Sequence, residues 1–563
     1  MSSKLGGRGQ GLGVGATGRS PLLPTPYSLI PDPWSLISTI PVVLPTVILL
    51  GMSFPGPDLP LLAWVALVPW LLLIGSEARV ALISWLIGII FFTVKLSWLG
   101  YATNIGWLLL SSYLSISYLL FGIACSYLHR NSGLPLALLA PFLWVSLEYL
   151  RGFLMTGFPW FYLGHTQYSY LSIIQIADIT GAYGVSFLIV AVNACFAQGL
   201  LRWWNGKGGH FLFAIAFILL LFPLSYGMFR LAGLSYQEGP RLCMVQGNIL
   251  QDLKMDTDVE QRKSNLQRYL DLSRLVLSEA EGKVGAEKVD MIVWPETSAP
   301  GLLNLDPKFW RDIDRFSQTS IFELAKELQT YLLVGGIAIE PGKGNNFEES
   351  TLYNSAFLYG PDGRPLDRYD KLHLVIFGEY TPLREVFPFL RHMVPYEIDL
   401  SPGSRRELLE FKGRRGDPAG RPYKFATLIC YEDTVPPLAR HFARQGADFL
   451  LNITNDGWFH DSPELDQHLA IMVFRAVENR MGMARAANTG ISAFVAPSGD
   501  IYSLITKNGK RREVEGILEG TILIARGGPS FYTRYGDLFS QLCLVVSVGL
   551  LLMPAVRRLG GGD

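Results

Sequence analysis

The feature that most constrains this chain is a series of long apolar stretches, seven within the first 235 residues and one near the end. Most of them approach the roughly 20 apolar residues that a helix needs to cross a bilayer. One such stretch by itself is equally typical of a buried core helix. Eight together predict an α-helical membrane domain with eight spans. The stretches lie at about 36–54, 61–75, 79–99, 106–128, 134–151, 181–201, 210–231 and 538–556.

The charged residues divide the chain between two solvents. Up to about residue 235 the acidic side chains are Asp32, Asp58, Glu77, Glu148 and Asp178, whereas the block from about 240 to 530 is as charged as a soluble protein. Such a split indicates lipid around the first part and water around the second. The predicted parts are a flexible tail at 1–35, a transmembrane domain with spans one to seven at 36–235, a water-exposed domain at 240–528, an eighth span at 538–556 and a tail at 557–563.

Lysine and arginine occur in alternate connections between the predicted spans, and the cytoplasmic side of a membrane is the side that carries them. This pattern places both termini in the cytoplasm and the 240–528 domain outside, which in a bacterium is the periplasmic side of the inner membrane. The first 33 residues lack the compact apolar core of a signal peptide, so we expect a retained tail. Arg151 is the exception to the pattern. The alternating pattern rests on the basic residues of the N-terminal tail and on Arg79, Arg130, Arg202, Lys207, Arg557 and Arg558.

Several function classes are excluded by what the sequence lacks. No basic block interleaved with aromatics is present, so we expect no nucleic-acid partner. The five cysteines form no Cys-x-x-Cys pair, and neither a disulfide framework nor a zinc site is indicated. The histidines, including His373, His460 and His468, follow no metal-ligand pattern. We therefore expect neither a metal nor a cofactor.

Two opposite charges, Glu148 and Arg151, stand in the fifth predicted span. They are three residues apart, so they share a helix face and can neutralise each other. Charges at membrane depth are costly and usually pair or line a polar cavity. Two interpretations stay open: the pair contacts a lipid headgroup, or it fixes this span against a neighbour.

The 240–528 domain alternates strand-like and helix-like segments, the order of an α/β fold. Three reactive side chains follow its strand-like segments. Glu296 follows Val289–Pro295, Lys371 follows Tyr369–Asp370, and Cys430 ends the apolar run Lys424–Ile429. A lone cysteine is more often structural, but a thiol at a strand-to-helix turn is also how a nucleophile is presented.

The three residue types are chemically complementary. A glutamate whose pKa is raised by burial accepts the proton of a thiol. The thiolate then attacks a carbonyl carbon, and a fixed ammonium stabilises the oxyanion that forms. Each residue alone is weak evidence for a site. Together they leave two interpretations open: one joint reactive site, or three unrelated surface or core positions.

These residues and their neighbours resemble a known family. Trp294-Pro295-Glu296, Tyr369-Asp370-Lys371 and Cys430-Tyr431-Glu432 resemble the Glu-Lys-Cys triad of the nitrilase superfamily. Together with the predicted spans, further motifs resemble the apolipoprotein N-acyltransferase family, its membrane-bound members, from about residue 35 to the end. These motifs are Glu148–Gly152, Gly157–Trp160, Val245–Asn248, Phe377–Pro382, Asn455–Phe459 and Arg485–Gly490. The resemblance implies an αββα-sandwich nitrilase-like catalytic domain carried on eight spans.

The resemblance also implies roles. Glu296 corresponds to the general base, Lys371 to the oxyanion-stabilising lysine and Cys430 to the nucleophile, while Glu379 resembles a supporting glutamate. Tyr431 and Glu432 match the positions after the nucleophile, and the backbone N–H of Tyr431 is a candidate oxyanion donor. Asn354 and Trp294 are further candidates for supporting the site. One departure is Met255, which follows Lys254 where the family pattern has a tryptophan.

The reaction that the resemblance implies is a ping-pong acyl transfer, the last step of lipoprotein maturation. Cys430 takes an acyl chain from the sn-1 ester of a phospholipid as a thioester, and the N-terminal amine of an S-diacylglyceryl-cysteine lipoprotein receives it. The expected partners are therefore a phospholipid, a diacylated apolipoprotein and the bilayer, and the expected state is a monomer. Two alternatives remain: a membrane-tethered nitrilase-type amidase or hydrolase, and a non-enzymatic lipid-binding scaffold.

A thioester is liable to hydrolysis, so a site of this kind has to exclude water while it admits lipid. The segment Glu385–Pro395 is more apolar than a soluble loop. We expect it to dip into the membrane interface as a lid. The alternative is a loop packed on its own domain.

Overall fold

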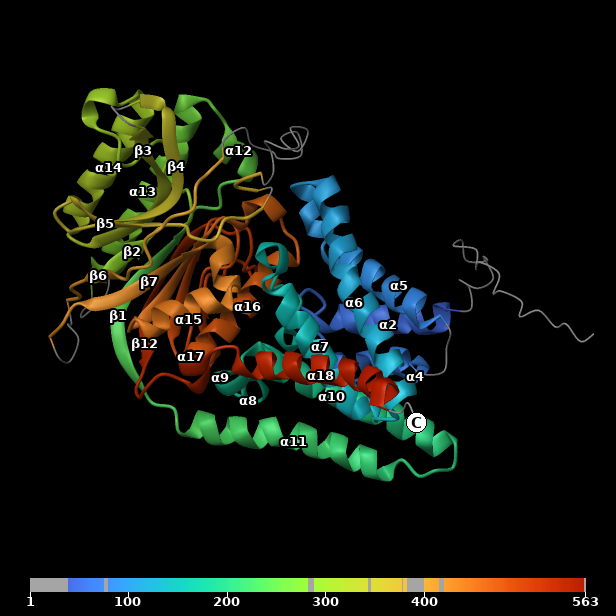
Figure 1. Ribbon diagram of the computed structural model, residues 1–563. Helices are drawn as coiled ribbons and strands as arrows, with labels where there is room; N and C mark the ends of the chain where they lie inside the picture. The colour runs from blue at the N-terminus through green and yellow to red at the C-terminus, as the bar shows by residue number, and fades with distance from the viewer. Residues whose placement is uncertain are drawn as a thin grey trace, which may run out of the picture. The chain divides into compact units, whose positions relative to one another are not determined.

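The computed structural model describes residues 39–74, 79–281, 288–342, 346–376, 378–381, 399–414 and 420–560 (Figure 1). The chain divides into two units, Met1–Pro41 and Val42–Asp563. The predicted tail at 1–35 and the predicted lid Glu385–Pro395 lie outside the described residues, as do the last three residues of the predicted tail at 557–563.

Helices occupy all eight apolar stretches. Three of the helices in the described residues are long and apolar enough to cross a membrane by length and composition, namely α6, α10 and α11. The coarse prediction of a helical membrane region is therefore confirmed, and the number of eight spans stays a prediction. The helices are α2 Ile40–Ser53, α3 Ala63–Ala66, α4 Val68–Leu73, α5 Val80–Lys95, α6 Asn104–Ser132, α7 Leu136–Arg151, α8 Leu171–Ile174, α9 Ala177–Thr180, α10 Ala182–Trp204, α11 His210–Ala232 and α18 Leu538–Gly560.

The second apolar stretch is broken into the short helices α3 and α4, and a proline stands next to the break. Pro69 stands in the first turn of α4, a position that tolerates a proline better than a helix interior does. The break leaves backbone groups without helical partners, and the side chain of Asn193 in α10 forms hydrogen bonds with two of these groups. Its Oδ1 accepts from the amide of Leu67 at 2.8 Å, and its Nδ2 donates to the carbonyl of Ala63 at 2.9 Å.

Glu148 and Arg151 both hold the segment that follows α7. The Glu148 Oε1 atom accepts from the amide of Leu163 at 2.7 Å, and Arg151 Nη2 donates to the carbonyls of Trp160 and Phe161 at 3.0 and 3.1 Å. Both ends of this pair are described, and no ion pair within 4.0 Å joins them. Arg151 still acts on the charge of Glu148, but the hydrogen-bond partners of both side chains lie in the neighbouring loop.

Within the described residues, twelve strands form two six-stranded sheets, in the orders β12-β1-β2-β3-β4-β5 and β11-β10-β9-β8-β7-β6. Strands β1–β2–β3 and β7–β8–β9 run parallel within their sheets. The first sheet contains β1 Tyr236–Gln246, β2 Met291–Val293, β3 Tyr331–Gly342, β4 Asn346–Tyr359, β5 Pro365–Asp370 and β12 Gly516–Ala525. The second contains β6 Leu409–Phe411, β7 Tyr423–Ile429, β8 Phe449–Thr454, β9 Gly482–Ala487, β10 Ala493–Val495 and β11 Ile501–Leu504.

The two sheets pack face to face between layers of helices. Alternate residues of a strand point to opposite faces, and in β1 Leu242 and Met244 join the core shared with the second sheet, whereas Cys243 and Val245 join a core with helices α13 and α14. Helices α15 and α16 lie on the other side, so the layers follow the order helix, sheet, sheet, helix (Figure 1). The helices are α12 Gln251–Met255, α13 Val259–Glu281, α14 Asp312–Leu328, α15 Pro436–Arg444, α16 Glu464–Asn479 and α17 Phe531–Tyr535.

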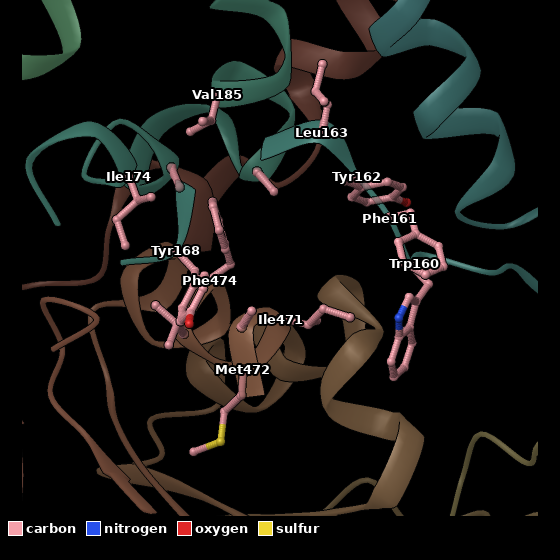
Figure 2. Packing of buried hydrophobic residues seen from close by; sticks show 14 of the residues in the cluster. Trp160, Phe161, Tyr162, Leu163, Tyr168, Ile174, Val185, Ile471, Met472 and Phe474 are labelled. Atoms are coloured by element: carbon pink, nitrogen blue, oxygen red, sulfur yellow. The ribbon is translucent and has the colours of Figure 1, made fainter. Parts of the chain in front are cut away.

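Helix α16 packs against the segment between α7 and α10. Figure 2 shows Ile471 and Phe474 of α16 on the side of the 160–185 segment, and these residues belong to one buried apolar cluster. A hydrogen bond also joins the segment to the helix, because Trp160 Nε1 donates to Gln467 Oε1 at 3.0 Å. The α/β domain is thus joined to the membrane helices by packing as well as by the chain.

A buried ion-pair cluster on Asp178 of α9 joins the same two regions. Its Oδ2 atom lies 2.7 Å from Arg480 Nη2, just after α16, and 2.9 Å from Arg230 Nη2 of α11. Tyr226 of α11 donates to Oδ1 at 2.7 Å. Because Asp178 and Arg480 are both buried, each needs the other to offset the loss of its hydration.

Replacing Asp178 by asparagine removes this charge and leaves the buried Arg480 without its counter-ion. We expect the free energy of unfolding to fall by about 3 kcal/mol, measured as thermal or denaturant unfolding of the protein in detergent. The matched control is Asp271→Asn, which breaks an exposed pair with Arg274 and is expected to change stability by less than about 1 kcal/mol. Equal losses in the two variants would contradict this account of Asp178.

Candidate active site

Cys430 lies at a sharp turn between β7 and the 3₁₀ helix η7, Cys430–Thr434. Its φ angle of 53° is in the left-handed region, which is strained for a residue with a side chain and is often found at functional turns. Asn452 of β8 supports the turn, because its Nδ2 donates to the carbonyl of Cys430 at 3.0 Å. Among the five cysteines, Cys430 is the one that is not fully buried.

Glu296 lies just beyond β2, where Pro295 ends the strand. Its carboxylate is buried and fully engaged: Asn354 of β4 donates to Oε1 at 2.7 Å and the amide of Asn455 donates to Oε2 at 2.9 Å. Lys371 Nζ lies 3.3 Å from the same Oε1 atom. The carboxylate therefore has one orientation, held by donors from three separate segments.

Lys371 follows β5 and is almost entirely buried. Its Nζ lies 2.9 Å from Glu379 Oε1 as well as 3.3 Å from Glu296 Oε1. Burial disfavours the ammonium, but the two carboxylates outweigh burial and raise the pKa of Lys371 above its ordinary value. Glu379 is fixed in turn by the amide of Val375, which donates to its Oε2 at 2.9 Å, and by Asn354 Nδ2 at 2.9 Å. Lys371 is thus a permanent cation in a fixed place.

The charges of Glu296 and Lys371 both act on the thiol of Cys430. Burial raises its pKa well above the ordinary value, the carboxylate of Glu296 raises it further, and Lys371 opposes both. A thiol in this environment is protonated at rest, so it becomes a nucleophile only when a base removes its proton. Glu296 is the carboxylate that acts on the thiol most strongly. The structure thus brings Glu296, Lys371 and Cys430 together, with Glu379 and Asn354 around them.

Glu432 binds the lysine segment to the cysteine turn. Its Oε1 accepts from the amides of Leu372 at 2.6 Å and His373 at 3.0 Å, and its Oε2 accepts from the amide of Ile429 at 2.7 Å. The hydroxyl of Tyr369 donates to both oxygens, at 3.0 and 2.9 Å. The buried side chain holds the backbone on both sides of the site.

Tyr431 connects the site with the segment after α7. Its ring is nearly parallel to that of Trp160, with an interplanar angle of 7° and a centroid distance of 6.3 Å. It also stacks on Phe158 and His373, and its hydroxyl donates to the carbonyl of Gly157 at 3.2 Å. The residue after Cys430 is therefore embedded in an aromatic wall contributed partly by the membrane region.

Trp294 lies on the other face of the first sheet. Its indole N–H donates to Ser273 Oγ of α13 at 2.8 Å, and its ring packs on Tyr269 at 5.4 Å, in the core between this sheet and its helices. These contacts support a packing role for Trp294. Met255, at the end of α12, is 47% exposed and makes no contact that fixes a role for it.

Two residues of the site were not singled out from the sequence. Asn455 donates its amide to Glu296 and its Nδ2 to Gln251 Oε1 at 2.8 Å. Lys254 donates from Nζ to the backbone carbonyl of Glu296 at 2.8 Å. Asn455 stands inside a motif of the family resemblance, and Lys254 adjoins the departure at Met255. The sequence signal for each residue was its place in or beside a motif. Such a place does not show which residue the side chain contacts.

Among the described residues, one group of side chains has the spacing of a metal site: Asp456, Glu464 and His468, all buried. Arg485 already supplies a cation there, with Nη2 2.8 Å from Asp456 Oδ2 and Nη1 3.2 Å from Asp433 Oδ2. Because Arg485 pairs with Asp456 and His468 lies near both Asp456 and Glu464, the group is explained as a buried ion-pair network. Thr454 Oγ1 connects it to the end of β8 by donating to Asp456 Oδ1 at 2.7 Å.

Two family models match successive parts of the chain. Residues 47–195 match the family of apolipoprotein N-acyltransferase N-terminal domains, and residues 241–523 match the carbon-nitrogen hydrolase family. The second match confirms the predicted nitrilase-like fold. Among solved structures, Nit3 of Saccharomyces cerevisiae, a member of branch 10 of the nitrilase superfamily, is 20% identical, covers 51% of this chain and 91% of its own, and has a TM-score of 0.35.

Two curated relatives are similar over nearly the whole chain. The apolipoprotein N-acyltransferase of Geobacter metallireducens is 36% identical over 534 residues, which cover 91% of this chain and 94% of the relative. The apolipoprotein N-acyltransferase of Chlorobaculum tepidum is 31% identical over 545 residues, which cover 91% of this chain and 95% of the relative. Both the membrane region and the α/β domain lie within these alignments.

Replacing Glu432 by glutamine tests how the site is held. The amide group puts N–H hydrogens where backbone N–H groups now donate, so we expect the Lys371 segment to move away from the thiol. Alkylation of Cys430 by iodoacetamide, followed by peptide mass spectrometry, should slow by about tenfold, which corresponds to about one unit in the pKa of the thiol. Glu410→Gln, at an exposed pair with Lys424, is the control. An unchanged alkylation rate in Glu432→Gln would refute the role of Glu432.

Proposed function

The chain belongs to the apolipoprotein N-acyltransferase family, and on that premise we propose how its site carries out the reaction. The protein is an acyltransferase that N-acylates lipoproteins. We infer that the donor is the sn-1 acyl chain of a phospholipid and that the acceptor is the α-amine of an S-diacylglyceryl-cysteine. The observation that carries the mechanism is the convergence of Glu296, Lys371 and Cys430 at one strand-to-helix turn.

In the first half-reaction Glu296 takes the proton of the Cys430 thiol as the sulfur attacks the ester carbonyl. A new S–C bond forms, and collapse of the tetrahedral intermediate breaks the C–O bond to the glycerol. Glu296 returns the proton to the departing oxygen, which leaves as a lysophospholipid. The acyl chain remains on Cys430 as a thioester. The raised pKa of the thiol supports this sequence, because a protonated thiol needs a base within the site.

Lys371 stabilises the oxyanion of both tetrahedral intermediates. Its ammonium stays charged because Glu379 and Glu296 raise its pKa, and it stays in place because two carboxylates hold it. A cation fixed before the reaction needs no reorganisation when negative charge develops on the substrate oxygen, which is why it lowers the barrier. Asn354 keeps the two carboxylates in position, since its Nδ2 atom bonds both.

In the second half-reaction the lipoprotein amine attacks the thioester. Glu296 takes a proton from the attacking nitrogen and gives it to the sulfur, so that an amide forms and the thiol is restored. A thioester suits this step because it reacts with amines more readily than an oxygen ester does. The aromatic wall of Tyr431, Trp160 and Phe158 supports an apolar approach to the site, which favours lipid over water.

The membrane arrangement that we propose has eight spans, both termini in the cytoplasm, and the domain at 240–528 on the periplasmic side of the bacterial inner membrane. The helices in all eight apolar stretches support it, as does the alternation of basic connections. The contact of Tyr431 with Gly157, six residues beyond α7, agrees with a nucleophile at the membrane surface. We propose that the protein acts as a monomer.

Replacing Cys430 by alanine should abolish transfer. Purified protein is incubated with phospholipid and a synthetic diacylated lipopeptide, and products are identified by mass spectrometry. The wild type should yield triacylated peptide and carry one acyl chain on Cys430, whereas Cys430→Ala should lose activity by about 10³-fold or more. Cys243→Ala, at a buried position in β1, is the control and should keep the acyl-enzyme. Free fatty acid without triacylated peptide would instead support an amidase-like hydrolase.

A further inference from the structure

The transfer step, as proposed above, leaves one proton without an acceptor. An N-terminal α-amine has a pKa of about 7.7–8.0 and is therefore mostly an ammonium at neutral pH. It has to lose one proton before it can attack the thioester and a second one after the C–N bond forms. Glu296 moves the second proton to the sulfur of Cys430, so the first proton needs a different base.

Among the residues that the structure describes, those that surround the triad do not supply this base. Lys371 is held as an ammonium by two carboxylates, and Glu379 is committed to Lys371, Asn354 and the amide of Val375. His373 is a weak base, because burial and the charge of Lys371 lower its pKa.

Lys254 differs from Lys371 in its partners. Its Nζ donates to the backbone carbonyl of Glu296 at 2.8 Å, and in the part of the chain that the structure describes no carboxylate oxygen lies within 4.0 Å of it. A neutral carbonyl does not hold a lysine in its charged form as a carboxylate does. The side chain is partly buried, and burial lowers the pKa of Lys254 to about 7, against the opposing fields of Glu296 and Cys430.

The groups that face Lys254 from the neighbouring segments are few. Glu296 lies beyond β2 and Cys430 lies at the turn after β7, and these two act on its charge. From α13, which packs on α12, the contact is made by the uncharged Asn265, whose Nδ2 donates to the carbonyl of Leu253 at 2.8 Å. On α12 itself Asp252 is exposed to solvent. Lys254 is therefore the amine of the site that neutral pH leaves partly unprotonated.

The position of Lys254 is fixed with respect to the general base. Helix α12 is tied to Glu296 at both ends, by Lys254 itself and by Gln251, which bonds the side chain of Asn455. Asn455 in turn donates its amide to the carboxylate of Glu296. Met255, the next residue, is exposed, so the end of α12 is open to an entering substrate.

We propose that neutral Lys254 accepts the proton that the lipoprotein ammonium gives up, and so acts as a second base of the transfer step. An N–H bond of the α-ammonium breaks and an N–H bond on Lys254 Nζ forms. The neutral amine of the substrate then attacks the thioester, and Lys254 later passes its proton to water. The proposal rests on the thioester mechanism above. It assigns Lys254 a role in the transfer step alone, because acylation of Cys430 releases no net proton.

The test separates the half-reactions in full-length protein. Acyl-enzyme formation from phospholipid is followed by intact-mass spectrometry, and the loaded enzyme is then mixed with a diacylated lipopeptide between pH 6 and pH 9. Lys254→Met should form the acyl-enzyme within about threefold of the wild-type rate and transfer it about tenfold more slowly at pH 7, because only about one tenth of the substrate amine is neutral there without a base. The deficit should narrow at pH 9, where the substrate amine is already neutral.

A second variant distinguishes chemistry from positioning. Lys254→Arg keeps a cation and an N–H donor for the Glu296 carbonyl, but a guanidinium holds its proton throughout this pH range. It should transfer as slowly as Lys254→Met at pH 7. Lys308→Met, at an exposed lysine paired with Asp306, is the control and should behave as the wild type.

Three results would overturn the proposal. Wild-type transfer by Lys254→Arg would show that the residue only positions Glu296. Equal losses in both half-reactions of Lys254→Met would show that Lys254 has a structural role. An undiminished transfer rate in this variant would show that Lys254 has no role in transfer. An absence of acyl chain on Cys430 in the wild type is a different outcome, because it overturns the thioester mechanism itself.

Discussion

The structure of the site depends on a small buried charge network in which one ammonium, that of Lys371, faces two carboxylates, those of Glu296 and Glu379. Charges removed from water are costly unless each has partners, and here the remaining lone pairs are taken by Asn354 and by the amides of Val375 and Asn455. Because the ammonium and both carboxylates each have several fixed partners, the network holds one geometry. That geometry is what an oxyanion stabiliser and a base require.

The strained turn at Cys430 is supported from behind by a second network. Glu432 ties the turn to the lysine segment through backbone amides. Its neighbour Asp433 pairs with His468 Nε2 at 2.7 Å and with Arg485. The environment raises the pKa of His468 well above its ordinary value, although burial and Arg485 oppose this, because Asp433 and Asp456 favour the imidazolium. A left-handed residue persists at the turn since its neighbours on both sides are anchored.

The same segment couples the α/β domain to the membrane helices. Tyr431 packs on Trp160 and bonds Gly157, Trp160 bonds Gln467 of α16, and Arg480 at the end of α16 pairs with Asp178 of α9. These contacts run from Tyr431, the neighbour of Cys430, through α16 to the membrane region. A lipid-processing site benefits from this arrangement, because its distance from the membrane helices is then set by packed elements instead of by flexible linkers.

The sequence by itself determined the solvent of each part, the helices in the apolar stretches, the α/β order and the strand ends at which Glu296 and Cys430 stand. These are local properties, because hydrophobic length and strand periodicity depend on neighbouring residues. With the family resemblance, the sequence also pointed to Glu379, Tyr431 and Glu432. Only the tertiary structure decided that Trp294 faces a helix core, that Glu148 and Arg151 bind a loop instead of each other, and that Lys254 and Asn455 meet Glu296. Those contacts join residues 9 to 159 positions apart. Sheet register and layer packing set them, and no local pattern records either.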